Sequence, residues 1–112
     1  MELKGHLEAE NIIVLSLAEE NLDASNVRVF KQAVALIIEE RPRVLLDLAA
    51  VNFVDSSGLG GLVACQRLMN SRKGEFRLCS LTSNVNALFE LMRMHRVFKI
   101  HETREAALKS FP

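Results

Sequence analysis

The chain has 112 residues, of which 49% are hydrophobic and 25% charged, an ordinary composition for a globular protein, so we expect a single domain over residues 1–112. Its 14 basic residues balance 14 acidic ones, which argues against nucleic acid or an anionic membrane as the main partner. No stretch approaches the roughly 18 apolar residues of a membrane span, so we expect no membrane insertion and a cytoplasmic location.

Cys65 and Cys79 are the only cysteines, and each lies in an apolar run. That placement favours two buried, reduced thiols over a disulfide. The three histidines are scattered along the chain and form no zinc-binding spacing with the cysteines. We therefore expect no metal site and no cofactor.

The chain begins with two predicted strands. Residues 3–8 alternate weakly and are typical of an edge strand, whereas the β-branched run at residues 12–17 is typical of a buried strand. Glu10 and Asn11 between them favour a turn, so we expect a β-hairpin.

An amphipathic helix and a central strand follow. Apolar residues recur at helical spacing over residues 27–38, and Pro42 stops the helix. Asp23 or Ser25 is expected to cap its first turn. Residues 44–48 are apolar with one interruption, which is typical of a central parallel strand covered on both faces.

Helices and strands alternate through the second half. A second helix is expected to begin within residues 56–58 and to end at a left-handed cap on Gly74. The remaining elements are a strand at 76–81, a helix with an apolar stripe at 85–92, a strand at 97–100 and a helix at 105–110. The expected caps are Thr82, Ser83 or Asn84 for the third helix and Thr103 for the last. In the last helix, Ala106 and Leu108 are expected to face inward.

The order ββαβαβαβα defines the fold class as α/β. It predicts a mixed, mainly parallel sheet of four to five strands with about four helices and right-handed crossovers. Such sheets meet ligands and partners at the carboxyl ends of their strands. Residues 55–60 lie at such an end, just before a helix.

The segment Asp55-Ser56-Ser57-Gly58-Leu59-Gly60 carries the functional interpretation. A serine there lies near the unpaired N–H groups of the first helical turn, which together with the helix dipole favour an anion. A phosphate on Ser56 or Ser57 would be tolerated while changing what a partner meets. The glycines at positions 58, 60 and 61 have no side chain to obstruct a partner's backbone. The alternative is that one of the serines only caps the helix and the glycines only pack.

Three enzyme interpretations are disfavoured. A nucleophile elbow needs a glycine two residues before the serine, where this chain has Val54 or Asp55. A phosphate-binding P-loop needs a lysine after its glycines, and none follows here. The acidic pair and late lysine that accompany the phospho-accepting aspartate of a receiver domain are also missing. We therefore expect a binding domain and not an enzyme.

Residues 51–60, Val-Asn-Phe-Val-Asp-Ser-Ser-Gly-Leu-Gly, closely resemble the signature of STAS domains, in particular of the bacterial anti-sigma-factor antagonists. The resemblance extends along nearly the whole chain. It includes Leu22-Asp23, the strand residues 45–48, and segments at 85–91, 96–98 and 105–108.

This resemblance implies a partner-switching regulator. Family members bind an anti-sigma factor that is also a serine kinase with a histidine-kinase-like ATP fold, and phosphorylation by that kinase ends the binding. A metal-dependent serine phosphatase restores it. The phosphorylated residue would be Ser56, the first serine of the signature. The implied docking surface consists of Asp23, Asp55, Ser56, Ser57, Gly58, Leu59 and Gly60.

The chain departs from the family pattern at two positions. Asn21 stands where the family often has glycine before Leu-Asp, and Arg93 replaces the usual glycine after the third helix. Nearby, Met92, Met94 and Phe98 are expected to be core or half-buried residues rather than a second interface.

Two other functions stay open. The same fold and motif would serve a STAS adaptor subunit of a lipid or anion transporter, or a switch acting on secretion or motility. An enzyme or nucleotide-binding domain would instead bind its nucleotide near Asp55.

Overall fold

The computed structural model describes residues 1–8 and 11–112. Its strands are β1 (Leu3–Glu8), β2 (Ile12–Leu17), β3 (Asn21–Leu22), β4 (Arg43–Asp47), β5 (Phe53–Val54), β6 (Glu75–Cys79) and β7 (Lys99–His101). Its helices are α1 (Val27–Glu40), α2 (Ser56–Ser71), α3 (Ser83–Leu91), the short 3-10 helix η2 (Met94–Arg96) and α4 (Arg104–Ser110). Each strand and helix that the sequence predicts is present, and the two-residue strands β3 and β5 are additional.

Five strands form the main sheet in the order β1-β2-β4-β6-β7. β1 pairs antiparallel with β2, whereas the other neighbours pair in parallel. The α/β class and the mixed, mainly parallel sheet are therefore confirmed. The antiparallel pairing predicted for the hairpin is present, but Glu10 of its expected turn lies outside the described residues. β3 and β5 form a separate parallel pair beside the main sheet.

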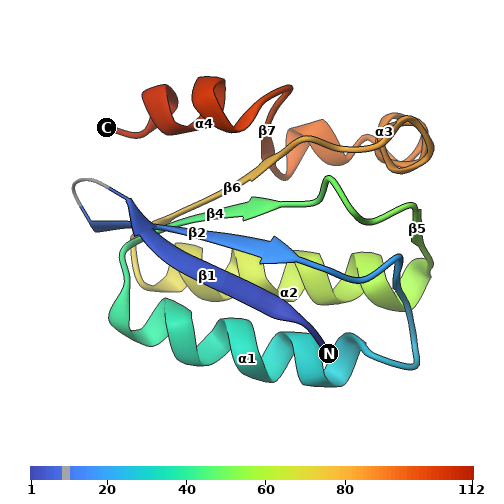
Figure 1. The fold of residues 1–112 in the computed structure, drawn as a ribbon, viewed down its shortest axis with the longest axis horizontal. Coiled ribbons are helices and arrows are strands. Elements are labelled where there is room, and N and C mark those ends of the chain that lie inside the picture. Colours follow the sequence, from blue (N-terminus) through green and yellow to red (C-terminus); the bar gives the residue numbers. More distant parts are fainter. Residues whose placement is uncertain (9–10) are drawn as a thin grey trace.

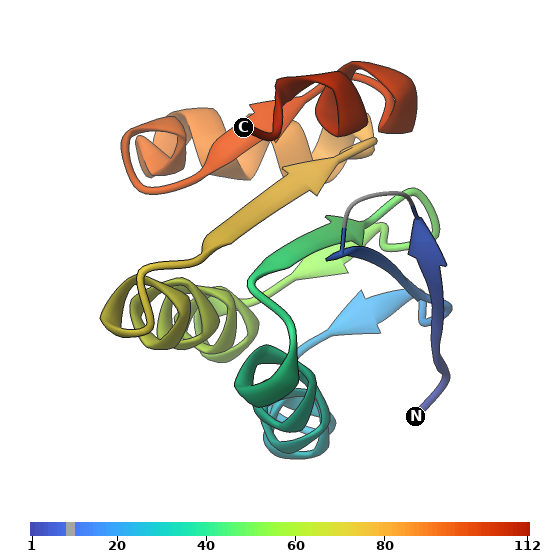
Figure 2. The same cartoon turned by 90° about the vertical axis from the view of Figure 1, so that its left-hand side faces the viewer.

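Helices cover both faces of the sheet (Figure 1). α1 and α2 lie side by side on one face, and α4 lies on the other, as the teal, yellow-green and red helices of Figure 2 show. Because side chains alternate along a strand, Leu46 belongs to the larger hydrophobic cluster and Leu45 to the smaller one, which includes Ala107 of α4. At one end of the larger cluster, Phe89 of α3 packs on Phe98 with ring centroids 5.8 Å apart.

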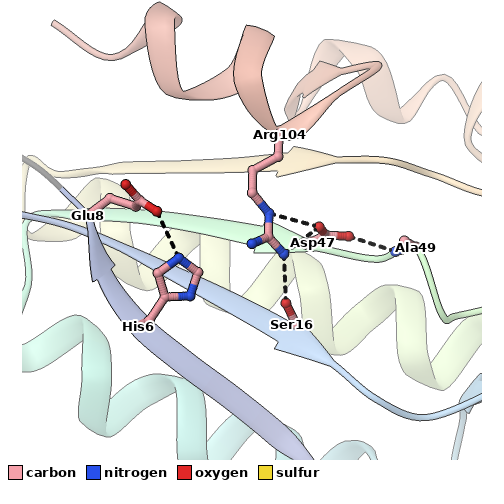
Figure 3. A network of polar contacts seen from close by, with 6 residues as sticks. All are labelled: His6, Glu8, Ser16, Asp47, Ala49 and Arg104. Atoms are coloured by element: carbon pink, nitrogen blue, oxygen red, sulfur yellow. Dashed lines mark hydrogen bonds and ion pairs between the residues drawn. The ribbon is translucent and has the colours of Figure 1, made fainter.

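The polar interruption of the central strand is Asp47, which is buried at the end of β4. Its Oδ2 accepts hydrogen bonds from Arg104 Nη2 at 2.8 Å and Nε at 3.2 Å, and its Oδ1 accepts one from the Ala49 N–H at 2.9 Å (Figure 3). Arg104 Nη2 also donates to Ser16 Oγ at 3.0 Å. This network joins the first residue of α4 to β4 and β2 and satisfies the buried carboxylate.

Two helix ends differ from the sequence prediction. The cap of α1 is Asn26 and not Asp23 or Ser25, because Asp23 bonds to Ser25 instead and offers its backbone carbonyl to the N–H of Val27. Among the described residues, Asn26 makes no side-chain capping bond within α1. Asn26 Oδ1 instead accepts from the Asp23 N–H at 2.9 Å.

After α2, the left-handed residue is Lys73, with φ 60°, and not Gly74. Gly74 is needed for a different reason, since a Cβ there would lie 2.7 Å from the carbonyl oxygen of Pro42. In α4, Leu108 is half-buried and packs against the smaller hydrophobic cluster as expected, whereas Ala106 is exposed and Ala107 is the fully buried residue. The caps at Thr82 and Thr103 are confirmed, because each hydroxyl accepts the N–H three residues further on.

Arg93, one of the two departures from the family pattern, has left-handed backbone angles, with φ 56° and ψ 37°. A residue with a Cβ pays about 1–2 kcal/mol for that conformation, which glycine adopts freely. The position therefore suits the glycine that the family usually has. The other departure, Asn21, pairs with Phe53 as part of β3 and accepts a hydrogen bond on its backbone oxygen from Asn26 Nδ2 at 2.8 Å.

Both cysteines are free and buried, as expected. Burial raises the pKa of the Cys65 thiol to about 12, against a smaller opposing effect of Lys31. Burial also raises the pKa of Cys79. Both thiols are therefore protonated, unreactive core groups in the folded chain.

Replacing Arg104 by alanine is expected to lower the free energy of unfolding by about 1–2 kcal/mol. The Asp47 carboxylate would stay buried and keep its hydrogen bond from the Ala49 N–H, but it would lose its hydrogen bonds and ion pair with the Arg104 guanidinium. Urea unfolding measures the change, and Arg28→Ala on the exposed side of α1 is the matched control. Equal stability of the two variants would contradict a structural role for the network.

The thiol pKa values predict protection from alkylation. At about pH 8, where an ordinary thiol with a pKa of about 8.5 is partly ionised, neither cysteine should react with a thiol reagent in the folded chain. Both should react at once after unfolding in urea. A chromogenic thiol assay with and without urea measures this, and prompt reaction of either cysteine in the absence of urea would refute it.

Candidate functional site

Asp55, the first residue of the segment Asp55-Ser56-Ser57-Gly58-Leu59-Gly60, is the N-cap of α2. Its Oδ1 accepts the N–H of Gly58 at 2.8 Å, and its Oδ2 accepts the N–H of Ala24 at 3.2 Å. One carboxylate therefore caps α2 and fastens the loop between β3 and α1 to it. The alternative in which Ser56 or Ser57 caps the helix is wrong.

Ser56 and Ser57 are the first two residues of α2, and both are exposed. Because Asp55 caps α2, neither serine hydroxyl serves as the cap. The N–H groups of a first helical turn have no partners inside the helix, and with the helix dipole they favour an anion. A phosphate on either serine would therefore lie at the end of α2 that tolerates negative charge.

The three glycines of this segment have different roles. Gly58 is buried, and a Cβ there would overlap the backbone carbonyl of Leu22 in β3. Gly61 is also buried, and a Cβ there would overlap a methyl group of Val27 in α1. Gly60 alone of the three has open space beside it. The expectation that all three leave room for a partner is therefore corrected, because Gly58 and Gly61 leave room for the chain itself.

Asp23 lies on the loop that Asp55 holds. Its Oδ1 accepts hydrogen bonds from the Ser25 hydroxyl at 2.6 Å and the Ser25 N–H at 2.9 Å. These bonds lower the pKa of the Asp23 carboxyl, with the hydroxyl having the larger effect. Asp23 is therefore ionised at neutral pH, on a loop next to the start of α2.

A hollow of about 360 Å³ opens beside Ser56. We call it the Ser56–Arg67 groove; its walls include Ser56, Leu59, Val63 and Arg67 of α2, and Met92 and Met94 after α3. The groove is not evident from the sequence. Phe98 is buried and Met94 half-buried as expected, but Met92 is 50% exposed. The sequence signal for the groove is that Ser56, Leu59, Val63 and Arg67 follow one another on α2 at spacings of three and four residues, which places them on one side of the helix.

Within residues 1–8 and 11–112, no group of three or more histidine, cysteine, aspartate or glutamate side chains is placed to hold a metal ion. The helices of this part of the chain are also too short or too polar to cross a membrane.

The fold and the site together define an α/β domain that displays a serine at the start of its second helix, beside a groove. Residues 7–107 match the family model of the STAS domain. The chain belongs to the STAS domain family.

Relatives by sequence are named as anti-sigma factor antagonists. BtrV of Bordetella bronchiseptica is 32% identical over 69 residues, which is 62% of this chain and 60% of that protein. The anti-sigma F factor antagonist of Paenibacillus polymyxa is 29% identical over 65 residues, 58% of this chain and 56% of that protein. These alignments thus span less than two thirds of the relatives they match.

Solved structures share the fold. A STAS domain protein of Planctomyces limnophilus superposes with a TM-score of 0.85 at 24% identity, covering 96% of each chain. The phosphorylated form of SpoIIAA from Bacillus has a TM-score of 0.72 at 17% identity and covers 96% of this chain and 97% of its own. Murine anion transporter Slc26a9 has a TM-score of 0.69 at 18% identity, over 88% of this chain and 17% of the transporter.

Replacing Gly58 or Gly60 by alanine is expected to have opposite effects on the free energy of unfolding. Gly58→Ala should lower the free energy of unfolding by about 1–3 kcal/mol, because the new methyl group meets the Leu22 carbonyl. Gly60→Ala should raise it by about 0.5–1 kcal/mol, because alanine favours the helix and its methyl group meets nothing. Urea unfolding of both variants tests the assignment, which fails if Gly58→Ala matches wild type or Gly60→Ala is the less stable.

Proposed function

We propose that this chain is an anti-sigma factor antagonist of the bacterial cytoplasm, acting as one STAS domain. In this proposal it binds an anti-sigma factor that is also a serine kinase with a histidine-kinase-like ATP fold. Phosphorylation of Ser56 by that kinase ends the binding, and a metal-dependent serine phosphatase restores it. The observation that carries the proposal is the placement of Ser56, exposed as the first residue of α2 and lining the groove.

The position of Ser56 suits a switch that leaves the fold intact. A phosphate there meets the positive end of the α2 dipole and displaces no buried group. The phosphorylated form of SpoIIAA has the same fold as this chain, so a phosphate is compatible with that fold. Ser56 is preferred over Ser57 because Ser56 also lines the groove.

Electrostatics explains how phosphorylation would end the binding. A phosphate adds about 1.5–2 negative charges to a surface that already carries the ionised Asp23. Like-charge repulsion and desolvation of the dianion then oppose a partner that was complementary before modification. An effect of about 3–4 kcal/mol would change the affinity by two to three powers of ten.

The proposed docking residues divide into two groups. Ser56, Ser57 and Gly60 are exposed, and Asp23 is half-buried, so these would touch the partner. Asp55, Gly58 and Leu59 would act mainly by holding the surface in shape, since Asp55 bonds to two backbone N–H groups and the other two residues are buried. The domain would work by binding and not by catalysis.

The relatives named as anti-sigma factor antagonists favour this role over a transporter adaptor. The likeness to part of an anion transporter concerns the fold alone, at 18% identity. Affinity capture separates the two roles, because an antagonist should recover an ATP-dependent serine kinase and an adaptor should recover a transporter.

The chain is incubated with ATP and a serine kinase that has a histidine-kinase-like ATP fold and comes from the same genome as the chain. This incubation is expected to add one phosphate at Ser56. Mass spectrometry of the intact chain and of its peptides locates it. Ser57→Ala is the matched control and should be modified normally, whereas Ser56→Ala should not.

Binding to the same kinase completes the test. Ser56→Ala should bind as wild type does, and Ser56→Asp should bind far more weakly. The proposal is wrong if Ser56→Ala still gains its phosphate, or if Ser56→Asp binds as tightly as wild type.

A further inference from the structure

We propose that the Ser56–Arg67 groove receives an acidic, amphipathic helix of the anti-sigma partner, with apolar side chains against Met92 and Met94 and a carboxylate on Arg67. This inference rests on the proposed function and adds the part of the partner that docks. It extends the proposed docking surface, because Arg67, Met92 and Met94 are not among the residues of that surface.

The shape of the groove fits a helix. Its α2 wall is formed at Ser56, Leu59, Val63 and Arg67, so it runs along one stripe of the helix. The eleven residue steps from position 56 to position 67, at 1.5 Å each, give a length of about 16 Å, or about three helical turns. Gln66 Nε2 donates to the backbone oxygen of Val97 at 2.9 Å, which fastens the segment after α3 to α2. The groove therefore follows about three turns of α2 beside a segment held to that helix, an arrangement that suits an amphipathic helix.

The segment that supplies the wall opposite α2 exposes apolar side chains. Met92, which lines the groove, is 50% exposed, and Leu91 and Val97 near it in the chain are 79% and 37% exposed. Methionine is flexible and polarisable, so it adapts to the apolar face of a partner. Two methionines that line the groove, one of them half exposed, favour a binding surface over plain solvent exposure.

The charges around the groove specify an acidic partner. Arg67 is the only charged residue of α2 and, among the described residues, the only charged side chain in the lining of the groove, and Arg93 lies between Met92 and Met94 in the chain. Neither arginine forms an ion pair with another residue of the described chain. In a chain with zero net charge, this local excess favours carboxylates on the occupant. The concave shape and the serine inside it favour a protein segment over a membrane surface.

The groove also couples the docking helix to the switch. A phosphate on Ser56 would lie at one end of the groove, where its charge would repel the carboxylates of the docking helix and its bulk would obstruct that helix. Because Arg67 and Ser56 would contact the same helix, the effects of Ser56→Asp and Arg67→Glu on the affinity should not be additive.

The test uses the full chain and the kinase that phosphorylates Ser56, with dissociation constants measured by calorimetry. Arg67→Glu and Met92→Gln are each expected to weaken binding by about tenfold or more. Arg67→Lys should retain most of the affinity. The matched controls are Arg28→Glu and Leu36→Gln on α1, where Leu36 is 67% exposed, and both should bind as wild type does. Thermal unfolding verifies that each variant is folded.

Salt provides a second readout. The affinity of wild type should fall more steeply with added salt than that of Arg67→Glu, because one attractive ion pair is missing in the variant. If Arg67→Glu and Met92→Gln bind the kinase as wild type does while Ser56→Asp does not, the groove inference is wrong and the proposed function stands. If no phosphate is added at Ser56, both fail.

Co-sedimentation with anionic vesicles tests whether the groove binds a membrane surface instead of a helix of the partner. Binding of the chain to vesicles of phosphatidylserine and phosphatidylcholine that is lost in Arg67→Glu, with kinase binding unchanged, would assign the groove to a lipid surface and overturn the inference. Absence of vesicle binding, together with the loss of kinase affinity in both groove variants, supports it.

Discussion

The site depends on one carboxylate with two hydrogen bonds. Asp55 accepts the N–H of Gly58 within its own helix and the N–H of Ala24 from the loop after β3. The same junction is tightened by β3 and β5, whose pairing brings the Leu22 carbonyl against Gly58. Because Asp55 takes the capping role, the serines that follow it are free for another use. Under the proposed phosphorylation of Ser56, this separate anchor would let the surface accept a dianion without unfolding.

Most of the fold could be predicted because its signals are long. The runs at residues 12–17 and 44–48 and the stripe of α1 each extend over several residues of one period, so they identify strands and a helix in the main sheet. The pair β3–β5 could not be predicted, since two residues carry no periodicity. Its partners also lie more than thirty residues apart in the chain, as the pairing of Leu22 with Val54 shows.

The site was predicted by motif and corrected by contacts. Three consecutive residues, Asp55, Ser56 and Ser57, can all cap a helix, and sequence alone does not choose among them. The hydrogen bond from the Ala24 N–H favours Asp55 as the cap. This bond is a tertiary interaction, so the sequence does not reveal it. Met92 is expected from the sequence to be core or half-buried and is instead 50% exposed, because hydrophobicity alone does not report which side of the end of α3 faces solvent. Gly58 and Gly60 look alike in the sequence and differ only in what lies beside them.

At Arg93, the backbone conformation and the side-chain charge favour different residue types. Its left-handed backbone favours glycine, and in the part of the chain that the structure describes its exposed side chain makes no ion pair that would offset this cost. Selection for stability alone would place glycine there and remove a positive charge that lies between the groove residues Met92 and Met94 in the chain. Under the proposed docking of an acidic helix, the arginine marks a trade-off in which thermodynamic stability is given up for a surface charge. Under that proposal, variants that improve stability at this position are poor guides to function.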